Sequence, residues 1–424
     1  MSRLIIKGGR KIGGRYTAPG NKNAALPMLA ASLLTDEPVI LENLPLIDDV
    51  RTMLEILSDI GADVSLAGHK VTIRAKGIRK HKLNAELCKK VRSSILFAGP
   101  MAARFGNVTL FPPGGDVIGR RPLDSHFYAL KELGIKVRGN GHLKFTRGKL
   151  EGKCMLLDEA SVTATENAVM AATLAKGRTE IYNAACEPHV QDLCIMLNAM
   201  GARITGIGTN CIKISGVERL HGVRHRISPD YISIASFITA AALTGGKLTI
   251  DGVKESDMII AARAFSKLGI IWQIKGDKLI LPSKQTLNIR NDFGSAIPKI
   301  EDGIWPAFPS DLMSVAIVAA TQAHGTMLFF EKLFESRMYF VDRLIEMGGR
   351  IVQCDPHRVI VSGAAKLQGT HLSSPDIRAG MALVIAALCA KGTSVIDNAH
   401  IIDRGYERID DELRALGADI QRKE

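Results

Sequence analysis

The chain has few aromatic residues and no long charged run. Only 5% of its 424 residues are Phe, Trp or Tyr, too few to suggest a surface on which nucleic-acid bases stack. Its net charge of +12 comes from 55 basic and 43 acidic residues, and no five like charges follow one another, which argues against a nucleic-acid arm or a polybasic membrane patch. We therefore expect neither nucleic acid nor membrane as a partner, and anionic small molecules as the ligands that the charge attracts.

Long apolar runs and paired cysteines are absent as well. No eighteen apolar residues stand together, and the first residues, MSRLIIKGGRKIGG, lack the apolar core of a signal peptide. The seven cysteines are odd in number and include no Cys-x-x-Cys pair, which argues against a disulfide framework and a zinc cluster. These absences predict a cytoplasmic protein with reduced, mostly buried cysteines. His221 and His225 have the spacing of a metal pair, but Gly222 between them favours a loop over a helix, so we expect no metal there.

What the chain does contain is a repeat, visible six times as an amphipathic helix that ends at a glycine and is followed by two short alternating runs. Each copy predicts a helix with a left-handed glycine after its last turn and then a β-hairpin. Upstream of each copy lies one more strand, and before most of these strands an alanine-rich helix that is apolar nearly all round, as expected of a helix packed inside the protein. The glycines that mark the six copies are Gly61, Gly134, Gly201, Gly269, Gly348 and Gly417.

A unit of about 70 residues with these elements is too small to bury its own faces, so the six copies should group as three and three. This predicts an α/β protein of two domains. One is discontinuous, residues 1–21 plus 230–424, and the other is residues 22–229. A ligand would sit between two such lobes. No dinucleotide-binding glycine fingerprint follows a strand, no Walker A sequence occurs, and nothing calls for a cofactor.

Three stretches break the repeat pattern and carry charge. In PGNKNAALP, Lys22 stands where a helix should begin, and the helix N-terminus together with a lysine makes an anion site. In PPGGDVIGRRPLDSH, residues 112–126, a rigid and then flexible loop presents Asp116 at its tip before two arginines. In HIIDRGYERI, Arg404 lies in a loop before the last helix, and arginine is the planar fork suited to phosphate and carboxylate. A surface position is the alternative reading for each cation taken singly.

Two aspartates precede apolar helices, Asp311 in WPAFPSDLMSV and Asp376 in SSPDIRAG. Both could serve as helix N-caps. The aromatic and proline neighbours of Asp311 suggest the wall of a pocket, so a catalytic role and a capping role both stay open for it.

Taken in order along the whole chain, KNAALP, PGGDVIGRRPLDSH, SVTATEN, AFPSD, FESR and DRGYERI resemble the UDP-N-acetylglucosamine enolpyruvyl transferases. The resemblance implies two inside-out α/β barrels of three repeats each, and the transfer of enolpyruvyl from phosphoenolpyruvate to the 3-hydroxyl of UDP-N-acetylglucosamine with release of phosphate, the committed step toward peptidoglycan. It implies no metal and no organic cofactor, and it leaves the oligomeric state open.

The same resemblance assigns roles to individual residues. Phosphoenolpyruvate would be held by Lys22, Arg121 and Arg404, with charge added by Arg92, Arg337 and Arg378. Asn23 and Asp311 would contact the sugar, and Asp311 would take the proton of the hydroxyl. The uridine diphosphate would be lined by Arg121, Pro122, Leu123, Asp124, His126, Ser161, Val162 and Thr163.

The loop 112–126 would close as a lid, and its tip departs from most of the family, where a cysteine protonates the methylene carbon. Here Asp116 takes that place, and we expect it to act as the general acid. Because a carboxylate is a much poorer nucleophile toward an epoxide than a thiolate, the resemblance also predicts resistance to fosfomycin, which alkylates the usual cysteine.

Other departures concern recognition of the acceptor. Tyr231 and Cys186 replace usual arginines, and Thr163 replaces a usual glycine. Three alternatives follow: a paralogue with another nucleotide or nucleotide-sugar acceptor, the related enzyme of the shikimate pathway, and a non-catalytic nucleotide-binding homologue that has lost the cysteine. Retention of Lys22 and Asp311 together with the arginines speaks against the last.

Overall fold

The computed structural model describes residues 2–116 and 118–424, so one position of the expected lid, Val117, lies outside the described residues. The chain divides into two compact units. Unit 1 comprises Met1–Pro19, Asp116–Arg120 and Pro229–Glu424, and unit 2 comprises Gly20–Gly115 and Arg121–Ser228. The expected lid belongs to unit 2 except for its tip, which makes its contacts with unit 1. The domain boundaries drawn from the sequence stay a prediction about which segments fold alone.

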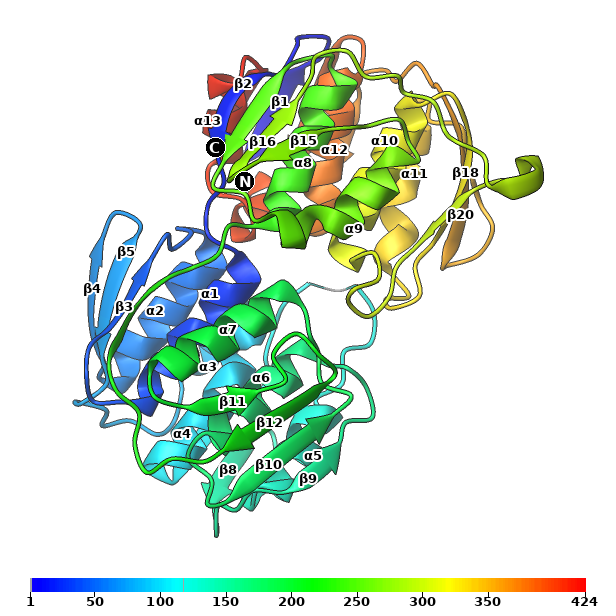
Figure 1. The fold of residues 1–424 in the computed structure, drawn as a ribbon. Helices are drawn as coiled ribbons and strands as arrows, with labels where there is room; N and C mark the ends of the chain where they lie inside the picture. The colour runs from blue at the N-terminus through cyan, green and yellow to red at the C-terminus, as the bar shows by residue number, and fades with distance from the viewer. Residues whose placement is uncertain (1, 117) are drawn as a thin grey trace. The chain divides into compact units, whose positions relative to one another are not determined.

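Unit 2 contains the first three repeats, each an inner helix, a strand, an outer helix and a hairpin (Figure 1). The first repeat consists of α1 (Lys22–Ala31), β3 (Val39–Glu42), α2 (Asp48–Ile60), β4 (Asp63–Ala67) and β5 (Lys70–Arg74). The second consists of α3 (Ala85–Lys90), α4 (Ala98–Phe105), β6 (Asn107–Leu110), α5 (Asp124–Glu132), β7 (Ile135–Gly139) and β8 (Leu143–Arg147). The third consists of β9 (Cys154–Leu156), α6 (Val162–Ala172), β10 (Arg178–Tyr182), α7 (Pro188–Ala199), β11 (Arg203–Thr205) and β12 (Cys211–Ser215), and β13 (Val223–Arg226) closes the unit.

Unit 1 repeats the arrangement. Its fourth repeat consists of α8 (Tyr231–Leu243), β14 (Leu248–Asp251), α9 (Glu255–Ser266), β15 (Gln273–Lys275) and β16 (Lys278–Leu281). The fifth consists of β17 (Lys299–Glu301), α10 (Met313–Gln322), β18 (Gly325–Phe330), α11 (Val341–Glu346), β19 (Ile351–Gln353) and β20 (Arg358–Gly363). The sixth consists of β21 (His371–Ser373), α12 (Ile377–Cys389), β22 (Thr393–Asp397), α13 (Ile409–Ala415) and β23 (Asp419–Lys423), while β1 (Arg3–Lys7) and β2 (Gly14–Thr17) come from the N-terminal segment.

The predicted helix ends are confirmed at all six repeat glycines, which have φ angles between +79° at Gly269 and +105° at Gly61. A residue without a Cβ atom adopts this left-handed conformation at little cost, so the helix can stop and the chain can turn into the hairpin. Each hairpin then pairs with the strand that precedes the outer helix. The pairings of β14 with β16 and of β10 with β12, both antiparallel, are examples.

Five of the six sheets have a fourth strand that the sequence did not reveal. This strand lies parallel to the strand after the inner helix, and the five such pairs are β13–β3, β9–β10, β2–β14, β17–β18 and β21–β22. In the sheet β6-β8-β7 a single parallel bridge between Lys82 and Thr109 occupies the same place. Three of these strands, β9, β17 and β21, have only three residues, which is too short for an alternating pattern to register.

The last repeat lacks the second strand of its hairpin, and β1 supplies it. β1 runs antiparallel to both β22 and β23, with Arg3 opposite Lys423. The sheet order is β21-β22-β1-β23. The N-terminal strand therefore acts as the extra element that the incomplete sixth repeat required.

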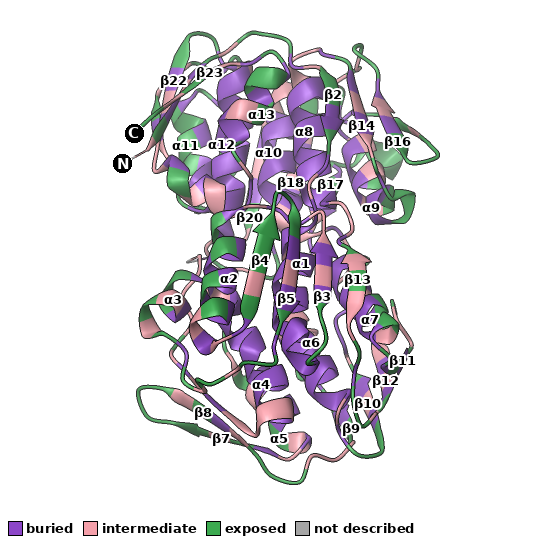
Figure 2. Cartoon of the chain, turned by 90° about the vertical axis from the view of Figure 1, so that its left-hand side faces the viewer, coloured by how far each residue is buried: buried purple, intermediate pink, exposed green. Residues whose placement is uncertain are grey.

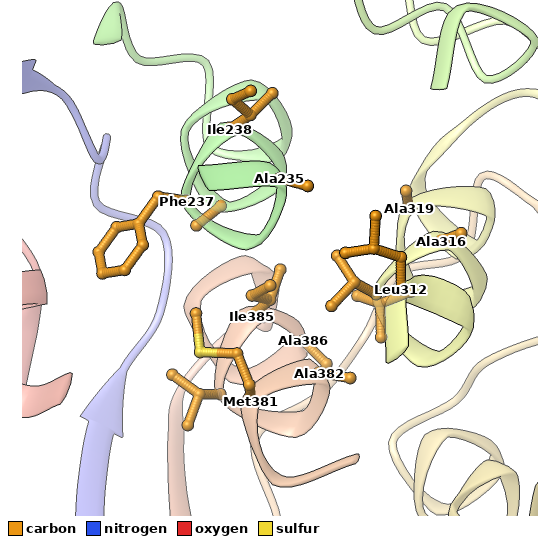
Figure 3. Packing of buried hydrophobic residues seen from close by; sticks show 14 of the residues in the cluster. Ala235, Phe237, Ile238, Leu312, Ala316, Ala319, Met381, Ala382, Ile385 and Ala386 are labelled. Atoms are coloured by element: carbon orange, nitrogen blue, oxygen red, sulfur yellow. The ribbon is translucent and has the colours of Figure 1, made fainter. Parts of the chain in front are cut away.

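The core of each unit is built from the alanine-rich helices, which are buried over nearly their whole surface (Figure 2). In unit 1, α8, α10 and α12 pack directly on one another. Figure 3 shows the small side chains Ala235 and Ala382 in the space between these helices, whereas Phe237 points away from it. Phe237 instead stacks on Tyr16 of β2, with ring centroids 4.0 Å apart. Small residues let these three helices approach closely. They form the centre of the unit, and the sheets lie outside them.

Candidate active site

In unit 1, one aspartate is held by two buried arginines. Asp311 Oδ1 accepts a hydrogen bond from Arg337 Nη2 at 3.0 Å, and Asp311 Oδ2 accepts one from Arg378 Nη2 at 3.0 Å. The arginine side chains are 5% and 8% exposed, and that of Asp311 is 28% exposed. The guanidinium groups are therefore fixed from the protein side, while the carboxylate keeps access to solvent and to a ligand.

Arg378 also lies over the ring of Tyr406, with its guanidinium carbon 5.6 Å from the ring centroid. The Tyr406 hydroxyl lies 3.0 Å from Ser236 Oγ on α8. Burial opposes the charge of Arg378, but the neighbouring carboxylates of Asp311 and Asp230 keep its pKa above the usual value. Arg378 stays cationic in this environment.

The tip of the loop, which is part of unit 1, makes three contacts within that unit. Asp116 forms an ion pair with Arg404, and both side chains are about four-fifths buried. Glu335 Oε2 accepts a hydrogen bond from the Arg120 backbone N–H at 3.2 Å, and the Ser336 N–H donates to the Ile118 carbonyl at 3.1 Å. The Asp116 carboxylate thus faces Arg404, one of the arginines expected to bind an anion.

The two candidate cap aspartates have different roles. Asp376 is the N-cap of α12, since its Oδ1 accepts hydrogen bonds from the backbone N–H groups of Arg378 and Ala379 at 2.8 and 2.9 Å. Asp311 lies within a 3₁₀ turn, Ser310–Leu312, for which no side-chain cap is recorded. The capping interpretation of Asp311 is wrong, because both of its oxygens face arginines.

Together, Asp116, Asp311, Arg337, Arg378 and Arg404 form what we call the arginine cluster of unit 1. It contains three guanidinium groups and two aspartates, so a net positive charge remains for an anion. Burial raises the pKa of the neighbouring Asp376 above its usual value, and the charge of Asp116 adds to this. Burial likewise raises the pKa of Asp230.

In unit 2, the predicted helix start at Lys22 is confirmed. Lys22 is the first residue of α1, Asn21 is its N-cap, and Asn21 Oδ1 accepts a hydrogen bond from the Ala24 N–H at 3.1 Å. The Lys22 ammonium lies 2.8 Å from Asp49 Oδ2 of α2, with the lysine side chain 10% exposed. Asn23 is half-buried beside it. A buried aspartate thus fixes the lysine at the helix N-terminus, where an anion would bind.

Arg92 and Arg121 lie close together in the same unit. Arg92 Nη2 donates hydrogen bonds to the carbonyl oxygens of Arg121 and Pro122, the second at 3.4 Å. Burial lowers the pKa of Arg92 to about 10, and the positive charge of Arg121 contributes. The two positive charges repel each other, and an anion bound between them would offset this repulsion.

His126 joins the starts of α5 and α6. Its Nδ1 lies 3.0 Å from the Asn167 amide nitrogen, and its Nε2 lies 3.0 Å from Thr163 Oγ1. Asn167 Nδ2 also donates to the Ile95 carbonyl, and its Oδ1 accepts from the Gly99 N–H, which fixes the orientation of the amide. Because an amide nitrogen only donates, His126 Nδ1 is the acceptor and Nε2 carries the hydrogen.

Burial, with a contribution from Arg92, lowers the pKa of His126 to about 3, so the ring is neutral near pH 7. Its Nε2–H donates to the Thr163 hydroxyl, whose own hydrogen is then available for another acceptor. We call Asn167, His126 and Thr163 the histidine relay. The other residues expected along the uridine diphosphate stand at the same two helix starts: Pro122, Leu123 and Asp124 at α5, and Ser161 and Val162 at α6.

The expectation of mostly buried cysteines is wrong. All seven have reduced thiols, but only Cys88, Cys186 and Cys194 are buried. His225 lies in β13 and contacts Asp192, whereas His221 contacts Glu37, so these two histidines have different partners. Within residues 2–116 and 118–424, every helix is too short or too polar to cross a lipid bilayer.

The fold defines the class. A family model described as EPSP synthase (3-phosphoshikimate 1-carboxyvinyltransferase) matches residues 6–413. The enolpyruvyl transferase NikO from Streptomyces tendae superposes with a TM-score of 0.89 at 23% identity and covers 100% of this chain and 99% of its own. An EPSP synthase from Acinetobacter baumannii superposes with a TM-score of 0.77 at 19% identity, with 100% of both chains covered. The chain has the enolpyruvyl transferase fold, and the expected fold class is confirmed.

Sequence relatives narrow this further. Proteins named UDP-N-acetylglucosamine 1-carboxyvinyltransferase match at 52% identity in Treponema denticola, with 100% of both chains covered, and at 53% in Borreliella burgdorferi, with 100% of this chain and 99% of the relative. Another in Bradyrhizobium diazoefficiens is 53% identical over 99% of this chain and 98% of its own. The chain belongs to the UDP-N-acetylglucosamine 1-carboxyvinyltransferase family.

Proposed function

We propose that this protein transfers the enolpyruvyl group of phosphoenolpyruvate to the 3-hydroxyl of UDP-N-acetylglucosamine and releases phosphate, at the start of peptidoglycan synthesis. The observation that carries the proposal is identity above 50% over essentially the full length of relatives with that name. The arginine cluster and the Lys22–Asp49 pair support it, because the donor substrate carries a phosphate and a carboxylate that need fixed cations.

The reaction requires an acid and a base. The 3-hydroxyl oxygen attacks C2 of phosphoenolpyruvate while its proton passes to a base and the methylene carbon C3 gains a proton from an acid. The resulting tetrahedral adduct then loses a proton from the new methyl group and the phosphate from C2, which restores the double bond. Asp311 is our candidate for the base, because two arginines hold it as a carboxylate while more than a quarter of its side chain stays exposed.

Asp116 is our candidate for the acid at C3. Its ion pair with Arg404 keeps it at a cation that should bind the anionic donor. Lys22 and Arg121 would be further contacts of the donor, and Arg92, Arg337 and Arg378 would supply the surrounding charge.

The remaining roles concern the acceptor. Asn23 beside Lys22 would contact the sugar together with Asp311. The starts of α5 and α6, which the histidine relay joins, would bind the uridine diphosphate, since exposed N–H groups at helix N-termini bind phosphate. The relay leaves the Thr163 hydroxyl able to donate one more hydrogen bond, which suits a diphosphate oxygen.

The test is a phosphate-release assay with phosphoenolpyruvate and four acceptors: UDP-N-acetylglucosamine, UDP-glucose, UMP and shikimate 3-phosphate. We expect turnover with the first alone and its loss in an Asp311→Asn variant that still binds UDP by calorimetry. Faster release with any other acceptor would overturn the assigned substrate. No release with any of them would leave the protein a nucleotide-binding homologue.

A further inference from the structure

Two carboxyl groups lie side by side in the interior of unit 1, below the turn that carries Asp311. β17 and β18 run parallel with Glu301 opposite Phe330, so the next residues, Asp302 and Glu331, are neighbours at the ends of the two strands. Both residues are 0% exposed, so the two neighbouring carboxyl groups lie away from water. No reaction step described above uses either of them.

The hydrogen bonds around the pair leave room for one proton. Ser310 Oγ donates to the Glu331 carboxyl, with its oxygen 2.8 and 2.9 Å from the two carboxyl oxygens. Asp302 Oδ1 accepts from the Lys332 backbone N–H. Asp302 Oδ2 is buried, and no N–H group of the described residues donates to it. A proton on Glu331 supplies that missing donor, and two ionised carboxylates in contact away from water would repel each other.

The pair holds both ends of the segment that leads to Asp311. Asp302 forms a β-bridge with Phe308, and the Gly303 N–H donates to the Phe308 carbonyl at 3.1 Å, which closes residues 303–308 as a loop. Ser310, the residue before Asp311, is then fixed by Glu331. The segment after Glu331 leads within six residues to Arg337, which binds Asp311 from the other side.

We propose that Asp302 and Glu331 share one proton, and that this carboxyl pair positions Asp311 and its partner Arg337 for proton transfer. The two are positioning residues, since neither reaches a substrate. The inference rests on the proposed function of Asp311, and it adds a requirement: the site stays in order only while the shared proton is present.

The charges that face the pair decide when the proton leaves. Burial raises the pKa of Glu331 to about 9, the hydrogen bond with Asp302 adds to this, and the positive charge of Arg337 opposes it. Four more charged or titratable side chains stand on the adjoining strand ends: Glu301, Lys332, His357 and Arg358. All four are at least partly exposed, and His357 Nδ1 is bonded to the Glu331 carbonyl at 2.7 Å.

The sign of the effect follows from the raised pKa of Glu331. Between about 4.5 and about 9 the folded state keeps a proton that the unfolded chain has lost. The stability that the pair contributes is therefore complete below about 4.5 and is lost as the pH rises through about 9. Turnover should fall on the same alkaline limb, because ionisation of Glu331 breaks its bond to Asp302.

The decisive variants keep or remove the hydrogen-bond donor between residues 331 and 302. In Glu331→Gln the amide N–H₂ can donate to Asp302 while its oxygen accepts from Ser310. We expect kcat at pH 7 within about threefold of the wild type, without the decline near pH 9. Asp302→Asn leaves the pair with the same net charge as Glu331→Gln, so its kcat and its pH profile should be similar. Glu331→Ala should lower kcat at least tenfold but leave the dissociation constant for UDP unchanged. The control is Glu301→Gln on the neighbouring exposed residue, which should keep the wild-type pH profile.

Two measurements stand apart from turnover. Urea unfolding of the wild type should show an unfolding constant that rises with pH between about 4.5 and 9 by up to tenfold per unit more than in Glu331→Gln. A crystal structure of Glu331→Ala, or of Asp302→Ala if the former does not fold, should show the 3.0 Å contact between Asp311 and Arg337 lost. An identical pH dependence in wild type and Glu331→Gln overturns the shared proton, and an unchanged contact overturns the positioning role. A wild type inactive with every acceptor, but with this unfolding profile, would refute the proposed function alone.

Discussion

Asp116 has two properties that a cysteine at the same position would lack. A carboxylate makes a strong ion pair with Arg404, and it is a poor nucleophile toward carbon electrophiles. Where the family uses a thiol, the same loop position can be alkylated. In the role that we propose for it, the aspartate donates a proton to carbon without that reactivity.

We expect the wild-type protein to show no time-dependent inactivation by fosfomycin, and Asp116→Cys to become sensitive while it keeps turnover. Asp116→Asn should lose roughly 10² to 10⁴ in kcat, the usual contribution of a general acid. Progress curves with and without preincubation with the drug measure both effects. Inactivation of the wild type that follows preincubation time, or a fully active Asn variant, would contradict the acid role.

At the scale of single residues, the sequence predicts which charged groups are candidates for the site but not which residues they contact. Lys22, Asp116 and Arg404 stood out because a cation or a carboxylate interrupted a loop or a helix start. Asp49, the partner of Lys22, did not stand out, and neither did Glu335, which accepts a hydrogen bond from the Arg120 backbone, since contacts between distant segments leave no local pattern. Glu331 could have been found: Met327 and Phe329 are the inward residues of β18, so alternation places Glu331 inward, and a charge at an inward position calls for a partner.

Among the elements, the helix ends were the most predictable part of the fold. A glycine at the end of an amphipathic helix before an alternating run is a local signal, and all six such glycines have the left-handed conformation. The short parallel strands were not predictable, because three residues carry no period and their pairing depends on segments far along the chain. α5 begins at Asp124, within the stretch 112–126 for which the sequence predicts a loop.

A glycine can be required for its backbone conformation or because a Cβ atom would not fit. Two glycines of the fourth repeat distinguish these two requirements. Gly269 and Gly276 both have positive φ, of 79° and 62°. A Cβ atom at Gly269 would collide with the Thr286 carbonyl and lie 2.8 Å from the Asn288 nitrogen, whereas at Gly276 it would meet nothing within 4 Å.

We therefore expect Gly276→Ala to lower the free energy of unfolding by about 1 kcal/mol, the cost of the left-handed backbone. Gly269→Ala should cost about 2 to 4 kcal/mol, because overpacking adds to that cost. Urea denaturation of the two variants measures the difference directly. Equal destabilisation would show that the chain after α9 moves aside for the methyl group at no cost.

On the scale of the whole molecule, each unit has a hydrophobic core of its own. The apolar core cluster of unit 2 is drawn from residues between Ala24 and Ile227, and that of unit 1 comes from Leu4–Ala18 and from the segment Tyr231–Ile420. A core that draws on one continuous segment can form without the rest of the chain. The predicted domain 22–229 is therefore a proposal that can be tested by expression.

We expect a fragment of residues 20–229, which includes the Asn21 cap, to unfold cooperatively and to bind UDP, but to release no phosphate from phosphoenolpyruvate. Calorimetry with UDP and circular dichroism on heating are the measurements. A His126→Ala fragment is the matched control, and its affinity should fall about tenfold since the Thr163 hydroxyl loses its partner. A wild-type fragment without a cooperative transition would refute the boundaries.

The place of β1 between β22 and β23 has a consequence for biosynthesis. β1 is translated long before its partners β22 and β23, so it cannot take its place between them until nearly all of unit 1 has been synthesised. All residues of unit 2 have by then emerged, and a continuous domain can fold while synthesis goes on. A circularly permuted gene that joins the two termini and opens the chain in a surface turn would bring these strands together early, and would show in a translation-coupled assay how much the waiting strand delays maturation.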